Sequence, residues 1–191
     1  MAASFEIIKT YFVPGFETNT ILVSNGGDAA LVDPNGDRRI LEKAAAGRNL
    51  RAIYLTHGHF DHISAANGWN VPVYMSALDI PVARGFSDMI LRQAGYDALG
   101  ETIDMKPGET EFLPGLRARA MAAPGHSPGQ LCFYFEPEGV FLSGDFIFDG
   151  AAGRTDLLGG DPAAMGKSLE EFKKMNIRAR VIPGHGPEFN L

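Results

Sequence analysis

Three of the five histidines in this sequence fall within one short segment, directly after an apolar run that predicts a β-strand. The strand is expected over residues 51–55, and the segment His57-Gly58-His59-Phe60-Asp61-His62 follows it. In an extended chain, residues i and i+2 point to the same side, so His57 and His59 can converge on one ion. Histidines this close would repel one another as cations, whereas a divalent metal holds them neutral. The segment therefore predicts a metal centre at a strand end.

The two remaining histidines lie in Pro-Gly-His triplets, in loops that follow later predicted strands. His126 comes after the strand predicted over residues 116–122, and His185 after the strand predicted over residues 180–182. A lone histidine in a loop is usually a solvated polar residue. Because both triplets follow strand ends, as the first histidine segment does, we expect His126 and His185 to supply outer ligands to the same centre.

A second metal position and a bridging carboxylate are also available. If the chain turns after His59, Asp61 and His62 can face an ion beside the first. Two cations need a carboxylate that neutralises and bridges them, and Asp145 is the best candidate because it follows the apolar strand predicted over residues 139–143. Taken alone, an aspartate at this position is more often a turn or cap residue. Because five histidines are also expected at this centre, the ligand role is favoured for Asp145.

The remaining pattern consists of strands in runs with helices interspersed, which is typical of mixed sheets covered by helices. Further strands are predicted over residues 5–13, 20–24, 29–33, 71–75 and 130–135, and the glycine pair at 26–27 predicts a hairpin turn. Helices are predicted over residues 37–46, 63–67, 78–86 and 162–175. Residues 87–102 show no clean period and are expected to form a loop or irregular helix.

Length and composition limit the class of protein. A chain of 191 residues, 45% apolar and 21% charged, is expected to form one domain over residues 1–191. No apolar run approaches the ~20 residues of a membrane-spanning helix, and the first residues lack a secretory signal, so no membrane partner is expected. The net charge of -6 disfavours nucleic-acid binding. Cys132 is the single cysteine, and we expect it to be a core residue because it lies in an apolar predicted strand. One cysteine cannot form an internal disulfide, so we expect a cytoplasmic protein.

Four motifs occur in the order in which one known superfamily carries them. They are T-H-x-H-x-D-H at residues 56–62, P-G-H-S-x-G at 124–129, G-D at 144–145 and P-G-H-G at 183–186. On these motifs the sequence resembles the metallo-β-lactamase superfamily, and more closely its glyoxalase II (hydroxyacylglutathione hydrolase) branch. Asn19-Thr20 and the segment 33–36 are similar to early elements of the family.

The resemblance implies a mixed α+β and α/β fold, a four-layer αββα sandwich with the metal site at one edge of the two sheets. It also implies two divalent metal ions with the following ligands. The first ion would be held by His57, His59 and His126, the second by Asp61, His62 and His185, and Asp145 would bridge them. We expect zinc, with iron or manganese as alternatives, because mixed imidazole and carboxylate ligation accepts all three metals.

The segment Gly153-Arg154-Thr155-Asp156 matches the small single-domain members of the branch. The resemblance implies that Arg154 contacts the glutathione part of the substrate; the alternative is a surface arginine paired with Asp156 or Asp161. Larger members continue into a C-terminal helical domain, which we do not expect here, so the preference for glutathione stays open. Ala65 stands where the family usually has glycine.

The implied activity is hydrolysis of a small-molecule thioester, probed best by S-lactoylglutathione. Two adjacent dications lower the pKa of a bridging water from about 15.7 to about 7, and the resulting hydroxide would attack the thioester carbonyl. Asp61 would orient this hydroxide and accept its proton. A thiolate leaves readily, so no strong general acid is needed. No histidine is left for a Ser-His-Asp triad.

Two other activities stay open from the sequence. A glutathione persulfide dioxygenase uses one iron held by two histidines and one carboxylate, and this class shares the Gly153–Asp156 segment. It typically has alanine before the final histidine, so Gly184-His185 favours the hydrolase. Lactone hydrolysis is the second alternative. The filled ligand positions disfavour a metal-binding module that has lost catalysis.

Overall fold

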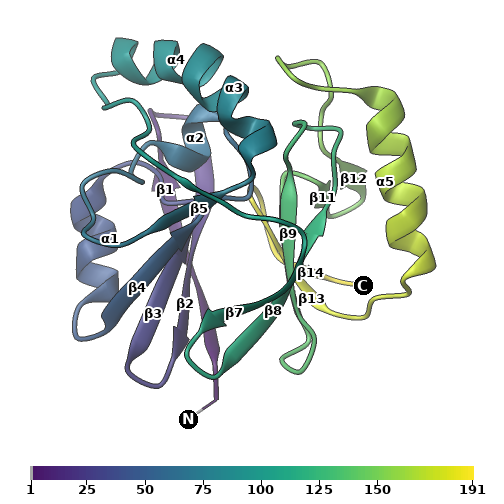
Figure 1. The fold of residues 1–191 in the computed structure, drawn as a ribbon, viewed down its shortest axis with the longest axis horizontal. Coiled ribbons are helices and arrows are strands. Elements are labelled where there is room, and N and C mark those ends of the chain that lie inside the picture. The colour runs from purple at the N-terminus through teal and green to yellow at the C-terminus, as the bar shows by residue number, and fades with distance from the viewer. Residues whose placement is uncertain (1) are drawn as a thin grey trace.

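Two six-stranded mixed sheets form the centre of the fold in the computed structural model, which describes residues 2–191 (Figure 1). The strands of the first sheet, in spatial order, are β1 (Ser4–Tyr11), β2 (Glu17–Asn25), β3 (Asp28–Val32), β4 (Asn49–Tyr54), β5 (Val73–Met75) and β6 (Ile103–Asp104). Those of the second sheet are β14 (Phe189–Asn190), β13 (Arg180–Pro183), β10 (Val140–Gly144), β9 (Leu131–Phe135), β8 (Leu116–Ala122) and β7 (Gly108–Leu113). A small hairpin joins β11 (Ile147–Phe148) to β12 (Ala151–Ala152).

Each sheet combines antiparallel hairpins with parallel neighbours. Strands β1, β2 and β3 are antiparallel, and β2 and β3 meet through the predicted hairpin turn, with Asn25 opposite Asp28. Strands β3 to β6 then continue as parallel neighbours. In the second sheet, β7 to β10 are antiparallel and β13 lies parallel to β10. Parallel pairs bring carboxyl strand ends to a common edge.

Alternate side chains of the central strands pack into different layers. In β2, Ile21 and Val23 belong to the core between the two sheets, whereas Leu22 packs on the helix side of its sheet. In β9, Phe133 faces the inter-sheet core and Cys132 faces the other way. Both faces of both sheets are therefore buried, which gives the four-layer αββα sandwich that the family resemblance implies. Cys132 is a buried core residue, also as predicted.

Helices cover the two outer faces of the sandwich (Figure 1). On the first sheet lie α1 (Arg38–Ala45), α2 (Phe60–Ile63), α3 (Ile80–Val82) and α4 (Asp88–Gln93), with a 3-10 turn η1 (Ala77–Asp79) and a π turn η2 (Ala83–Ser87). The second sheet is covered by α5 (Pro162–Lys174). Asp37 caps α1, and its carboxylate accepts from the Arg39 N–H. Within residues 2–191, no helix is long and apolar enough to cross a membrane.

Two predicted elements differ from the structure. The helix predicted over residues 63–67 is wrong: α2 begins at Phe60 and is capped by His59, whose carbonyl accepts from the His62 N–H. The helix predicted over 78–86 is a succession of η1, α3 and η2; the segment 87–102, expected to form a loop or irregular helix, contains α4.

Strand β7 was not predicted from the sequence. It lies at a sheet edge with Glu109 and Glu111 exposed, so apolar and polar residues do not alternate along it. The short strands β6, β11, β12 and β14 were missed as well. Each spans two residues, too few for a period to appear.

The predicted site residues come from segments that meet at one edge of the sandwich. Leu131 N–H at the start of β9 donates to the Thr56 carbonyl after β4 (2.8 Å), which joins the two sheets. Gly184 N–H after β13 donates to the Gly144 carbonyl at the end of β10 (2.8 Å). The ends of β4, β10 and β13 and the loop before β9 are thereby held together, and this edge carries the site.

Candidate metal centre

The predicted ligands gather into two clusters at this edge. We call His57, His59 and His126 the first cluster; one nitrogen of each lies within 4.8 Å of the others. Asp61, His62 and His185 form the second cluster by the same measure. A further grouping, Asp33 with His57 and His62, shares two of these histidines. The two clusters thus contain six of the seven residues predicted as ligands, all except Asp145.

Asp145 lies between the two clusters. Its Oδ2 is 3.5 Å from His126 Nε2 in the first cluster and 3.4 Å from His185 Nε2 in the second. Gly184, directly before His185, makes this convergence possible: a Cβ there would lie 2.6 Å from the His62 ring. One carboxylate therefore reaches both clusters, which is the geometry expected of a bridging ligand.

The orientation of His57 follows from a short chain of hydrogen bonds. Thr56 has one hydroxyl proton, and it donates this proton to Asp33 Oδ2 (2.6 Å). His57 Nδ1 lies 3.0 Å from the same hydroxyl oxygen and must therefore be the donor in that contact. Its Nε2 then carries a lone pair, is buried, and has no hydrogen-bond partner within residues 2–191. This nitrogen is ready to bind a cation.

Three other histidines are fixed in the same way, each with Nδ1 against an oxygen that can only accept. His62 Nδ1 donates to Asp33 Oδ2 (2.9 Å), His126 Nδ1 to the Arg154 carbonyl (2.8 Å) and His185 Nδ1 to the Glu17 carbonyl (2.5 Å). An acceptor behind Nδ1 fixes the ring and directs Nε2 inward, which is how proteins usually orient metal-binding histidines.

The sequence interpretation assigned no role to Asp33, Thr56 or Glu17. Asp33 follows β3 with a positive φ of 51°, and its buried carboxylate serves both His62 and the Thr56 hydroxyl. Its sequence signal resembles that of Asp145, an aspartate directly after an apolar strand. Glu17 acts through a backbone carbonyl, which no sequence motif can reveal.

Burial keeps two imidazoles of the first cluster, those of His57 and His59, neutral. It lowers the pKa of His59 to about 4, and the nearby His126 adds to this effect. Burial also lowers the pKa of His57 well below its ordinary value, with a further contribution from His62. Neutral imidazole is the form that binds metal ions, so these residues need no deprotonation at neutral pH.

In the second cluster, carboxylates outweigh the effect of burial. Burial opposes a charge on His185, but its hydrogen bonds to Asp145 and Asp61 raise its pKa to about 11. Burial likewise opposes the charge on Asp145, yet the nearby His62 and His185 hold the pKa of that carboxyl well below its usual range. Positive charge is therefore strongly favoured here, and a divalent cation can take the place of the histidine protons.

The donor set fits a pair of divalent metal ions. Imidazole nitrogens and carboxylate oxygens suit zinc, iron and manganese. Two buried atoms that face the clusters lack a hydrogen-bond partner within the described residues: His57 Nε2 and Asp145 Oδ1. Unpaired buried polar atoms are costly, and coordination of a cation would satisfy them.

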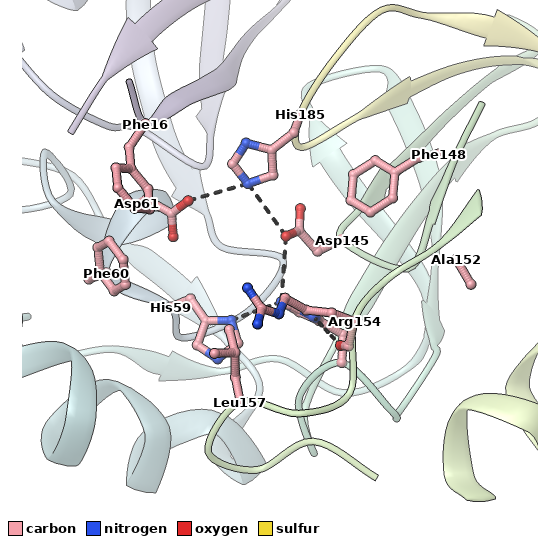
Figure 2. Close-up of a pocket in the computed structure, with 11 residues that line it drawn as sticks. Phe16, His59, Phe60, Asp61, Asp145, Phe148, Ala152, Arg154, Leu157 and His185 are labelled. Carbon is pink, nitrogen blue, oxygen red and sulfur yellow. Dashed lines mark hydrogen bonds and ion pairs between the residues drawn. The ribbon is translucent and has the colours of Figure 1, made fainter. Parts of the chain in front are cut away.

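Part of each cluster lines an open pocket of about 390 Å³, namely His59 and His126 of the first and Asp61 and His185 of the second, together with Asp145 (Figure 2). Phe16 and Phe60 stand on one side, and Phe148 and Ala152 on the opposite side. Leu157 adds a further apolar side chain to the pocket lining. The pocket therefore combines a polar base of candidate ligands with apolar walls, so that a reacting group at the base could have apolar substituents above it.

Arg154 lines the same pocket, and its guanidinium forms a bidentate ion pair with Asp156, with both N···O distances at 2.7 Å. Pairing with Asp156 is the alternative considered from the sequence. The pair is exposed, so water screens it. The Arg154 backbone has a separate role, because its carbonyl orients His126.

A mixed αββα sandwich with histidine and aspartate clusters at the sheet edge defines a class of metal-dependent hydrolases. Residues 13–185 match the family described as "Metallo-beta-lactamase superfamily". The chain belongs to this superfamily.

Individual relatives fit a glyoxalase II-like branch of it. The chain is 30% identical to a "Probable metallo-hydrolase YqgX" of Bacillus subtilis, over 92% of this chain and 88% of the relative. It is also 30% identical to a "Hydroxyacylglutathione hydrolase GloC" of Haemophilus influenzae, over 91% of this chain and 88% of the relative. Among solved structures, TTHA1623 "in a di-iron-bound form" superposes with a TM-score of 0.83 at 32% identity, covering 96% of this chain and 94% of that chain.

Proposed function

We propose that this protein hydrolyses a glutathione thioester of the S-lactoylglutathione type with two divalent metal ions, zinc in the first place. The observation that carries the proposal is the complete pair of clusters joined by Asp145 at the base of a pocket. The similarity to a hydroxyacylglutathione hydrolase along most of both chains supports the choice of substrate. A di-iron-bound structural relative keeps iron as the alternative metal.

The first cluster would hold one ion and the second cluster the other, with Asp145 shared. When bound, the two ions supply hydroxide at neutral pH by lowering the pKa of a water to about 7, and they stabilise negative charge on a carbonyl oxygen. The Nδ1 anchors of the histidines would keep the ligand nitrogens in place through the reaction.

Asp61 is the residue we propose to orient the attacking water and to accept its proton. It lines the pocket, and its Oδ2 lies 3.3 Å from His185 Nε2. Burial opposes its charge, but the nearby His62 and the hydrogen bond from His185 hold the pKa of Asp61 below its ordinary value. An ionised carboxylate at this point accepts a hydrogen bond from water.

Arg154 is the residue we propose to bind a carboxylate of the glutathione moiety. Among the described residues that line the pocket, it is the only lysine or arginine. Its exposed pairing with Asp156 is easily exchanged, because surface ion pairs are weak. A planar guanidinium can form two parallel hydrogen bonds with a substrate carboxylate. The apolar walls would contact the acyl group.

The test combines metal analysis with a substrate assay on the purified chain. We expect two zinc ions per chain and hydrolysis of S-lactoylglutathione, followed as loss of thioester absorbance. A single iron per chain, with oxygen consumed on a glutathione persulfide and no thioester hydrolysis, would contradict the proposal in favour of a dioxygenase. Hydrolysis of lactones without hydrolysis of thioesters would contradict the proposed substrate alone.

A further inference from the structure

A buried carboxylate outside the two clusters contacts the backbone of both segments that carry the first cluster. Asp79, at the end of η1, has no exposed surface. Its Oδ2 accepts hydrogen bonds from Gly58 N–H (2.8 Å) and from the Ser127 hydroxyl (2.7 Å). Its Oδ1 accepts from the Gly129 N–H. The sequence pattern gave Asp79 no role beyond membership of a predicted helix.

The first contact fixes the peptide unit between two candidate ligands. Gly58 separates His57 from His59, so its N–H and C=O set the directions of both side chains. The N–H is held by Asp79, and the C=O accepts from the Ser87 hydroxyl (2.7 Å). Both polar groups of this residue are thus held by one stretch of chain, from η1 to the end of η2.

The second contact fixes the loop of the third ligand. Ser127 follows His126 directly, and Gly129 lies two residues further, so Asp79 holds this loop at two points. Gly58 and Gly129 both lie very close to the backbone of Asp79. A Cβ at Gly58 would lie 2.8 Å from the Asp79 carbonyl oxygen, and one at Gly129 would lie 2.8 Å from the Asp79 nitrogen. Glycine at both positions lets the two ligand segments pack directly against the Asp79 backbone.

The second cluster has different anchors. The loop that carries His185 is held by Asn19, whose Nδ2 donates to the carbonyls of Pro183 (2.8 Å) and Gly186 (3.0 Å). His62 is anchored by Asp33. Among the described hydrogen bonds of the Asp79 carboxylate, none reaches the second cluster. A change at Asp79 should therefore affect one metal position and spare the other.

We propose that Asp79 is a positioning residue for the first cluster: its carboxylate holds two segments far apart in sequence at the spacing that lets His57, His59 and His126 share one ion. The inference rests on the metal centre of the proposed function. A buried carboxylate is costly unless several donors compensate it, and here two amides and one hydroxyl do so.

The variant Asp79→Asn tests the proposal with little change of shape. An amide has one acceptor oxygen, so its NH₂ group must face at least one of the three donors and lose that hydrogen bond. Each cluster is measured separately by removing a ligand of the other. In the His185→Ala background, which keeps the first cluster intact, we expect Asp79→Asn to raise the zinc Kd about 10- to 100-fold. In the His126→Ala background, which keeps the second cluster intact, the Kd should not change.

Zinc affinity is measured by competition with a chromophoric chelator, using the full chain. Asp104→Asn is the matched control: its carboxylate accepts from Ala77 N–H (2.8 Å) and so supports the same η1 turn without touching a ligand segment. It should leave both Kd values unchanged. Independently of metal, Asp79→Asn should speed hydrogen exchange of the Gly58 and Gly129 amides in the metal-free chain.

The outcomes separate the two proposals. If the unmodified chain binds no zinc, the proposed metal centre is wrong and the inference falls with it. If the chain binds two zinc ions and Asp79→Asn weakens both clusters equally, or neither, the positioning role is refuted while the metal centre stands. If Asp79→Asn does not fold, Ser127→Ala decides: it removes one of the three hydrogen bonds of the Asp79 carboxylate and should raise the Kd of the first cluster roughly three- to tenfold. An unchanged Kd in Ser127→Ala would overturn the inference.

Discussion

Replacing Asp33 with asparagine should weaken metal binding by the second cluster, because it moves one proton on His62. The Asp33 carboxylate accepts three hydrogen bonds, at 2.7 Å from the Thr56 N–H, 2.6 Å from the Thr56 hydroxyl and 2.9 Å from His62 Nδ1. In Asp33→Asn the amide oxygen can keep the Thr56 N–H, and the NH₂ group then faces the other two donors. His62 can pair with this NH₂ only if its own proton moves to Nε2, the nitrogen that faces the cluster.

The expected loss of metal affinity and of stability follows from these lost hydrogen bonds. Changing the group behind a metal-binding histidine typically costs about 10- to 100-fold in metal affinity, which corresponds to about 1.4 to 2.8 kcal/mol. Because Asp33 is buried, a donor left without an acceptor should also lower the free energy of unfolding of the metal-free chain by about 1 to 3 kcal/mol. We expect kcat/KM for S-lactoylglutathione to fall with the loss of zinc.

The assay compares zinc affinity, thioester hydrolysis and urea unfolding of Asp33→Asn with those of Asp37→Asn. Asp37 is a partly exposed helix cap four residues further on, and its substitution should leave zinc binding and hydrolysis unchanged. If Asp33→Asn binds two zinc ions as tightly as the unmodified chain and hydrolyses the thioester at the same rate, the proton argument is wrong.

Three further predictions concern the ligands, the substrate and the metal. Asp145→Ala should abolish hydrolysis and reduce bound zinc, since this carboxylate reaches both clusters; full activity in the variant would exclude a bridging role. Arg154→Ala should lower kcat/KM for S-lactoylglutathione about tenfold and leave the zinc content unchanged. For a thioester that lacks the glutathione peptide, kcat/KM should be the same in the variant and the unmodified chain. An equal loss of kcat/KM on both substrates would indicate that Arg154 supports its loop through Asp156 instead. Dialysis against a chelator should remove activity and lower the Tm, and zinc should restore both, because a ligand that binds only the folded state stabilises it; a Tm that does not respond would contradict a tightly bound metal pair.

The sequence alone determined which side chains meet at the metal centre. An apolar strand followed by His-x-His places His57 and His59 on one side, and an aspartate after another apolar strand indicates Asp145. These are local signals, carried by residue type and by spacing along a few residues. The same local alternation predicted most strands of the two sheets, since a strand buried on one face or both leaves a visible apolar pattern.

How these side chains are held depends on contacts between segments far apart in the sequence. Asp33 reaches Thr56 and His62, and Asp79 reaches Gly58 and Ser127, across 20 or more residues of sequence. The carbonyls of Glu17 and Arg154 fix His185 and His126, and a carbonyl is present at every residue, so no side-chain pattern can mark it. A hydrogen bond depends on the relative position of donor and acceptor within a few tenths of an ångström. That position is set by the packing of two sheets against each other, which a one-dimensional pattern does not contain.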